Sequence, residues 1–164
     1  TVELLNTGAE GRLVLADALV RAGEDVPDGI IDVATLTGAQ MVALGNRISA
    51  VMGNDDELRD DIVHSAAMVG EQFWPMPLPV ELRESLDSPI ADIANIGDRM
   101  GGMLTAGLFL QDFISDDTAW AHLDIAGPAF NEAAPHGYTP KGGTGVAVRT
   151  LVQIVRDLAD SNSL

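Results

Sequence analysis

Short apolar segments and amphipathic segments alternate along the whole chain, and this alternation is the feature that most limits the fold. Residues 30–34, 48–52 and 120–125 are short, largely apolar runs, as expected of buried strands. Residues 15–22 and 58–69 instead repeat apolar side chains every three or four positions, which is typical of helices packed on a core. The sequence therefore predicts an α/β fold in which helices cover a mostly parallel sheet.

Signals at the segment ends add further elements. Gly23 and Pro27 end the first helix, and the run over 54–56 supplies an N-cap and an acidic first turn for the helix over 58–69. Three prolines exclude a helix over 74–79, so we expect that stretch to be extended. The other expected elements are strands over 2–5 and 91–96 and helices over 39–44 and 104–114.

The last helix has the clearest apolar stripe. Leu151, Val152, Val155 and Leu158 recur at the spacing of one helical face, so we expect all four to pack on the core. A mostly polar tail over 161–164 follows this helix.

The composition excludes several classes of protein. A chain of 164 residues can form one domain with a real core, and 46% apolar residues is typical of a globular chain. The net charge of -16 repels phosphate groups, so we expect neither nucleic acid nor a membrane as a partner. Without cysteine there is no disulfide or thiolate metal site. The sequence has neither an apolar run of about 18 residues nor a signal-peptide pattern, so we expect a cytoplasmic protein.

The segment over 6–13 lies where a strand should end and a helix begin, which is a common place for ligand sites in α/β folds. A cation such as Arg12 in the first helical turn opposes the helix dipole, but together with free N–H groups it favours an anion. Glu10 is a hard oxygen donor suited to a divalent metal. The alternative is a surface ion pair between Glu10 and Arg12. The spacing alone leaves both interpretations open.

This segment reads N-T-G-A-E-G-R-L and closely resembles the signature N-T-D-A-E-G-R-L of the leucyl (cytosol) aminopeptidases. Companion motifs follow in the family's order over 32–39, 91–95, 120–127 and 142–145, so the resemblance covers nearly the whole chain. It implies that residues 1–164 form the C-terminal half of a two-metal aminopeptidase catalytic domain, an incomplete part of a larger fold. The opening inside an apolar stretch also suggests a truncated chain.

The resemblance implies a hydrolase that removes N-terminal residues, leucine among them, from peptide substrates. Two divalent metal ions, manganese or zinc, would activate a water and polarise the scissile carbonyl, and the intact protein would be a homo-hexamer. Glu10 would be a metal ligand, and Arg12 a catalytic residue that holds bicarbonate as a general base. Thr35, Leu36 and Gly38 match the loop that lines the substrate pocket, and Met103 is a further substrate-pocket candidate.

The chain departs from the family pattern in two respects. Gly8 stands at the position of an Asp metal ligand, and glycine offers no side chain to replace it. The family's remaining metal ligands and its catalytic Lys come from sequence upstream of the signature. We therefore expect the chain alone to be inactive. The alternative function is a non-catalytic family member or fragment with a role in assembly.

Other candidate residues have simpler interpretations. His64, His122 and His136 are far apart in sequence and lack metal-ligand spacing, so we expect structural roles for them. Asp92 and Asp124, near strand ends, should bind loop N–H groups. The glycine-rich run over 142–145 lacks the spacing of a phosphate loop and predicts a turn before the last helix.

Overall fold

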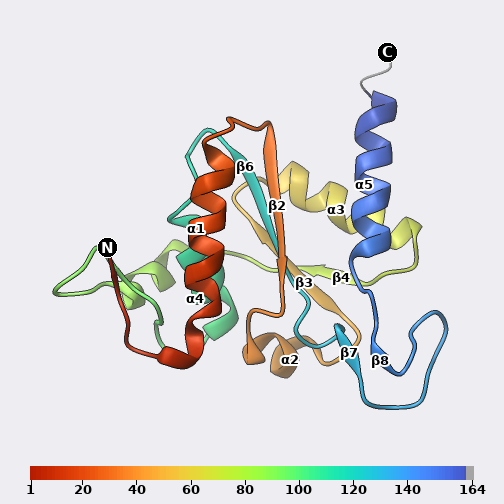
Figure 1. Cartoon of the computed structure of the whole chain (residues 1–164), viewed down its shortest axis with the longest axis horizontal. Helices are drawn as coiled ribbons and strands as arrows, with labels where there is room; N and C mark the ends of the chain where they lie inside the picture. The colour runs from red at the N-terminus through yellow and green to blue at the C-terminus, as the bar shows by residue number, and fades with distance from the viewer. Residues whose placement is uncertain (162–164) are drawn as a thin grey trace.

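The computed structural model describes residues 1–161, and its centre is a four-stranded sheet with helices on both sides (Figure 1). Strands β2 (Gly29–Ala34) and β6 (Ala119–Asp124) pair in parallel, as do β3 (Ser49–Gly53) and β4 (Phe73–Pro75). The central pair, β6 with β3, is antiparallel, and the strand order is β2-β6-β3-β4. Parallel pairs thus predominate, as the sequence predicts.

Two pairs of helices cover the sheet. Helices α1 (Gly11–Gly23) and α4 (Gly102–Gln111) lie over one face, and α3 (Asp56–Met68) and α5 (Val148–Ser161) over the other (Figure 1). Successive side chains of β6 point to opposite faces. Trp120 packs with residues of α1 and α4, whereas Ala121 packs with residues of α3 and α5. These two clusters form the core on the two sides of the sheet.

Strands β1 (Val2–Glu3) and β5 (Ile93–Ala94) form a separate, two-stranded parallel sheet. The parallel pairs β1 with β5 and β2 with β6 each bring two strand ends that are distant in sequence to the same edge. The remaining elements are the 3-10 helices η1 (Thr7–Ala9) and η2 (Val80–Leu86), the helix α2 (Gly38–Leu44), and the antiparallel strands β7 (Phe130–Asn131) and β8 (Gly142–Gly143). Within residues 1–161, no helix is long and apolar enough to span a membrane.

The structure confirms most predicted elements but shortens both strands of the β1–β5 pair. Strand β1 ends at Glu3 and β5 at Ala94, because beyond that point the side chain of Asn95, rather than its backbone, accepts the N–H groups of Leu5 and Asn6. Asp55 caps α3 as predicted, accepting a hydrogen bond from the Leu58 N–H at 2.7 Å. The proline-rich run over 74–79 is not helical.

The helix predicted over 104–114 ends earlier than expected. Helix α4 ends at Gln111, and its last carbonyls are bonded in turns that involve Asp112 and Phe113. In the final segment, Ser161 still belongs to α5, and residues 162–164 of the predicted tail lie outside the described residues.

The predicted apolar stripe of α5 is confirmed for Leu151, which is partly buried against the core, and wrong for the other three residues. Val152 and Val155 are 46% and 66% exposed, and Leu158 is 58% exposed, whereas Thr150 and Ile154 are buried. The cause lies at the start of the helix.

Buried Glu71, which precedes β4, accepts hydrogen bonds from the N–H groups of Ala147 and Thr150 and from the Thr150 hydroxyl. This anchor turns the face of Thr150, rather than that of Val152, toward the protein.

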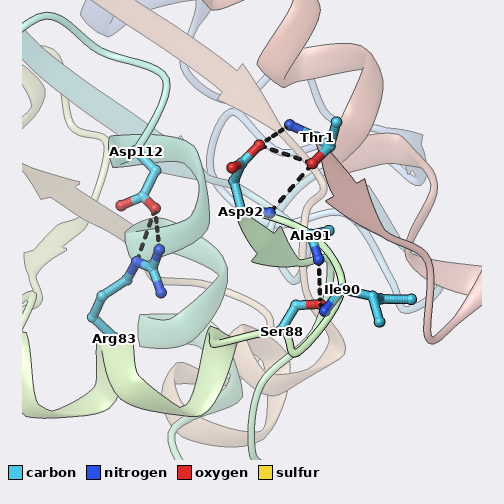
Figure 2. Close-up of polar contacts among 7 residues, drawn as sticks. All are labelled: Thr1, Arg83, Ser88, Ile90, Ala91, Asp92 and Asp112. Atoms are coloured by element: carbon cyan, nitrogen blue, oxygen red, sulfur yellow. Dashed lines mark hydrogen bonds and ion pairs between the residues drawn. The ribbon is translucent and has the colours of Figure 1, made fainter.

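Polar contacts fasten the segment between β4 and α4 (Figure 2). Arg83 of η2 donates from Nε and Nη2 to one oxygen of Asp112, at 2.8 and 2.6 Å, and so ties η2 to the end of α4. The hydrogen bond to Asp112 raises the pKa of Arg83. The hydroxyl group of Thr1 donates to the Asp92 carboxylate at 2.8 Å, just before β5.

Candidate functional site

The segment that follows β1 forms a compact turn into α1. The side chain of Asn6 accepts a hydrogen bond from the Gly8 N–H at 2.8 Å and so caps the 3-10 helix η1. Glu10 is the N-cap residue of α1, and its carboxylate forms no capping bond. Gly8 and Glu10 are both exposed, so the two positions that the family resemblance assigns to metal ligands lie at the surface of this chain.

Arg12 is the buried residue of this turn. It is only 9% exposed, its Nη1 donates to the backbone carbonyl of Asn95 at 2.8 Å, and its guanidinium carbon lies 5.9 Å from the ring centre of Phe109. Burial lowers the pKa of Arg12, and the negative charge of Asp124 opposes that effect.

Arg12 forms no ion pair within the described residues, so the alternative of a surface pair between Glu10 and Arg12 is wrong. A buried guanidinium without a paired carboxylate is suited to bind an anion from solution.

Asn95 holds the turn from the neighbouring strand, and we did not single it out from the sequence. Its Oδ1 accepts hydrogen bonds from the N–H groups of Leu5 (2.9 Å) and Asn6 (3.2 Å), and its Nδ2 donates to the carbonyl of Asn6 at 2.8 Å. The sequence signals for Asn95 are a polar residue inside a short strand candidate and its place in the companion motif over 91–95.

A second loop, over 35–38, follows β2 and is held in a similar way. Asp124 is fully buried at the end of β6 and accepts hydrogen bonds from the Leu36 N–H (3.1 Å) and the Thr37 hydroxyl (2.7 Å). The Thr37 hydroxyl in turn caps α2 by accepting the Gln40 N–H at 3.0 Å. The prediction that Asp124 binds loop N–H groups is confirmed. Because Asp124 also acts electrostatically on Arg12, this one carboxylate connects the two loops.

The four predicted pocket residues fall into two groups. Thr35 and Gly38 are exposed, and Leu36 is half-buried against the cluster formed by α1 and α4. Met103 is 3% exposed and packs with Ala50 and Met52 in the core. The loop over 35–38 is therefore accessible, whereas the burial of Met103 gives no support to a role in binding substrate.

The described residues do not form a metal centre by themselves. No group of three or more His, Cys, Asp or Glu side chains within residues 1–161 is placed to hold a metal ion. Glu10 is the one carboxylate in the turn over 6–12, called the signature turn below, and Gly8 supplies none. A Cβ atom at position 8 would lie 3.2 Å from Asn6 Oδ1, so only the exposed Asn6 side chain would have to adjust to a larger residue.

His122 has a structural setting in the core. Its Nδ1 lies 2.5 Å from one oxygen of Asp32, while the Trp120 indole N–H donates to the other oxygen at 2.8 Å. His122 Nε2 is buried and has no partner among the described residues. His136 instead lines a cavity of about 580 Å³ that neither His122 nor Asp32 lines; Arg47, Glu71, Tyr138 and Arg149 also line it. His122 and His136 thus lie in different surroundings, and His64 is exposed on α3.

The prediction of a turn over 142–145 is confirmed only in its second half, because Gly142 and Gly143 form strand β8, paired with β7, and the turn into α5 follows them. The Thr144 hydroxyl donates to the Pro128 carbonyl at 2.7 Å, and the Val148 N–H donates to the Gly145 carbonyl at 3.2 Å. The turn contains none of the predicted site residues.

Comparison with known sequences places this geometry in a family. Residues 1–152 match the sequence profile of the cytosol aminopeptidase family, catalytic domain. The chain is 69% identical over 154 residues to a probable cytosol aminopeptidase of Streptomyces avermitilis, covering 94% of this chain and 30% of the relative. It is 63% identical to a probable cytosol aminopeptidase of Streptomyces coelicolor, over all of this chain and 32% of the relative. The chain thus spans about a third of the length of these relatives.

Solved structures agree with the sequence comparison. The bottromycin maturation enzyme BotP superposes with a TM-score of 0.93 at 45% identity, over 97% of this chain and 35% of that one. A structure of the same enzyme in complex with Mn gives 0.92. A K354E mutant of tomato leucine aminopeptidase gives 0.89 at 43% identity, over 94% of this chain and 29% of that one. By sequence and by fold, the chain belongs to the cytosol aminopeptidase family.

Proposed function

We propose that the protein to which this chain belongs is a metal-dependent aminopeptidase that removes N-terminal residues, leucine among them, from peptides. The chain would supply two active-site loops, the turn over 6–12 and the loop over 35–38. The observation that carries this proposal is Arg12, a buried guanidinium in the family's signature segment that has no carboxylate partner among the described residues.

Arg12 would bind an anion, bicarbonate being the candidate, that accepts a proton from the attacking water. One nitrogen, Nη1, is fixed by the Asn95 carbonyl, which leaves other guanidinium N–H groups to hold the anion. The surrounding burial strengthens such a charged contact, because less water screens it.

The loop over 35–38 would bind the substrate's N-terminal residue. The Leu36 N–H already donates to Asp124. The backbone carbonyl of Leu36 would therefore be the group that accepts a hydrogen bond from the substrate's ammonium. The exposed residues Thr35 and Gly38 would border the side chain of that residue.

The metal ions, manganese or zinc, would need ligands from outside this chain. The manganese complex of BotP supports a divalent metal in the family, and Glu10 is positioned as a candidate ligand. The described residues do not fit a complete centre, however, so we assign no catalytic step to a metal held by this chain. We expect the isolated chain to be inactive, and the intact protein to be a cytoplasmic hexamer.

The proposal can be tested in a chimera in which this chain replaces the matching segment of the Streptomyces avermitilis relative. The chimera would carry Gly8→Asp, so that the signature segment regains its carboxylate. In that background, Arg12→Met keeps an unbranched apolar stem against Phe109 but removes the charge. We expect kcat/KM for leucine amide to fall about 100-fold or more, the usual effect of removing a charge-stabilising donor.

The matched control is Arg21→Met, on the exposed side of α1, which should keep kcat/KM within about twofold. Full activity in the chimera with Arg12→Met would contradict the role proposed for Arg12.

One observation favours a second candidate, a non-catalytic family member that acts through assembly. Gly8 stands where the family signature has a carboxylate. In that case the chimera that keeps Gly8 should assemble with the same mass as the Gly8→Asp chimera but retain less metal after dialysis. Equal, full metal occupancy of the two chimeras would exclude this alternative.

A further inference from the structure

Asn95 lies at the one place where the start and the end of the signature turn can be held together. Strands β1 and β5 run in parallel, so the residues that follow them emerge side by side. The Asn95 N–H donates to the Glu3 carbonyl at 2.9 Å and so continues the ladder for one more residue. At the next step the two strands part, because the chain after Glu3 turns toward α1.

The Asn95 side chain takes over where the ladder stops. It is fully buried and makes three hydrogen bonds, two as acceptor and one as donor, all to the backbone of Leu5 and Asn6. The side chain of Asn6 in turn accepts the N–H of Gly8. The path of the chain through positions 5–8 thus depends on one amide group that comes from a segment 89 residues away.

The backbone of the same residue holds the far end of the turn. The carbonyl oxygen of Asn95 accepts Nη1 of Arg12 at 2.8 Å, and this is the hydrogen bond that orients the buried guanidinium. Asn95 therefore contacts the turn before position 8 through its side chain and after position 10 through its backbone.

We propose that Asn95 is a positioning residue, which sets the position of residues 8 and 10 relative to the Arg12 guanidinium. The expected effect of Asn95 on catalysis rests on the proposed function, whereas its hydrogen bonds to the turn do not depend on that function. Asparagine suits the role because it offers an acceptor and a donor on one planar group. Aspartate would keep the acceptor for Leu5 and Asn6 but would face the Asn6 carbonyl with an oxygen instead of a donor.

Asn131 provides a matched control. It is also a buried asparagine, 8% exposed, whose side chain holds only backbone groups, accepting the Ala133 N–H and donating to the carbonyls of Ala134 and Pro140. It lies in β7, away from the signature turn. Replacing either asparagine by alanine should reduce stability. Only Asn95 contacts the signature turn, so an effect seen with Asn95→Ala and not with Asn131→Ala reports on positioning rather than on stability.

The first experiment measures leucine amide hydrolysis by the Gly8→Asp chimera carrying Asn95→Ala, Asn95→Asp or Asn131→Ala, well below the lowest melting temperature. A displaced catalytic group lowers turnover more than binding, so we expect Asn95→Ala to lower kcat about 100-fold with KM nearly unchanged. Asn95→Asp should retain an intermediate kcat, and Asn131→Ala should match the parent. Equal kcat in Asn95→Ala and Asn131→Ala would overturn the inference while leaving the proposed function intact.

The second experiment does not need activity. In the 164-residue chain itself, amide hydrogen exchange followed by NMR reports directly on the N–H groups of Leu5, Asn6 and Gly8. Asn95→Ala should accelerate exchange at all three, whereas Asn131→Ala should not. If the Gly8→Asp chimera proves inactive, the proposed function fails, and this exchange pattern alone then decides whether Asn95 positions the turn. Unchanged exchange at Leu5 and Asn6 would overturn the inference.

Discussion

The buried carboxylate of Asp124 holds the loop over 35–38 through hydrogen bonds. It accepts hydrogen bonds from the Leu36 and Ala126 N–H groups and from the Thr37 hydroxyl, and it is fully buried. Replacement by asparagine would substitute an NH₂ group for one acceptor oxygen. The Thr37 hydroxyl could not satisfy that group well, because it already accepts the N–H of Gln40.

We therefore predict that Asp124→Asn lowers the free energy of unfolding by about 2 kcal/mol, the typical effect of leaving a buried polar group unsatisfied. Urea denaturation of the 164-residue chain measures this directly. Asp17→Asn, at an exposed position of α1, should change the free energy by less than about 0.5 kcal/mol. A loss as small as that of Asp17→Asn would mean that Asp124 does not hold the loop over 35–38.

Gly127 makes a second sharp prediction at the scale of one residue. An added Cβ would lie 2.1 Å from the Gly45 carbonyl oxygen, a backbone atom that cannot easily move. We expect Gly127→Ala to lower the free energy of unfolding by about 3 kcal/mol. Gly23→Ala, at the end of α1 with nothing within 4 Å, should instead be neutral or slightly stabilising. Thermal melting of both variants would reveal the contrast, and equal melting temperatures would contradict it.

The sequence allowed Glu10, Arg12 and the loop over 35–38 to be named, because they follow strand ends in motifs that resemble a family. It did not reveal Asn95 as a contact of Arg12. A polar residue at a strand end has many possible partners, and its actual partners here lie 83 to 90 residues away. Only the parallel pairing of β1 with β5 brings them together.

At the scale of elements, α5 shows where periodicity misleads. Leu151, Val152, Val155 and Leu158 form a helical stripe in the sequence. The structure instead buries the face that contains Thr150 and Ile154, and only Leu151 of the predicted four packs against the core. A local pattern predicts the helix but cannot reveal the anchor, Glu71, which comes from the segment before β4.

We predict that Glu71→Ala lowers the free energy of unfolding by about 2–3 kcal/mol, because the N–H groups of Ala147 and Thr150 lose a buried acceptor. Glu132→Ala, at an exposed loop position, is the control and should remain within about 0.5 kcal/mol of the parent chain. Chemical denaturation provides both values. If the two variants are equally stable, another contact must fix the rotation of α5.

At the scale of the whole molecule, the alternation of strands and helices was enough to predict the α/β class and a mostly parallel sheet covered by helices. It was not enough to predict that β3 runs antiparallel to β6. Strand direction depends on how each connection crosses the sheet, and both directions produce the same apolar run in a buried strand.

At the same scale, we propose that this chain contributes two loops to an aminopeptidase site that it does not complete. The most direct test is hydrolysis of leucine amide, with added manganese or zinc, by the 164-residue chain, by the chimera that keeps Gly8 and by the Gly8→Asp chimera. We predict no activity in the isolated chain, clear activity in the Gly8→Asp chimera and much lower activity in the chimera that keeps Gly8. Hydrolysis by the isolated 164-residue chain would contradict the account.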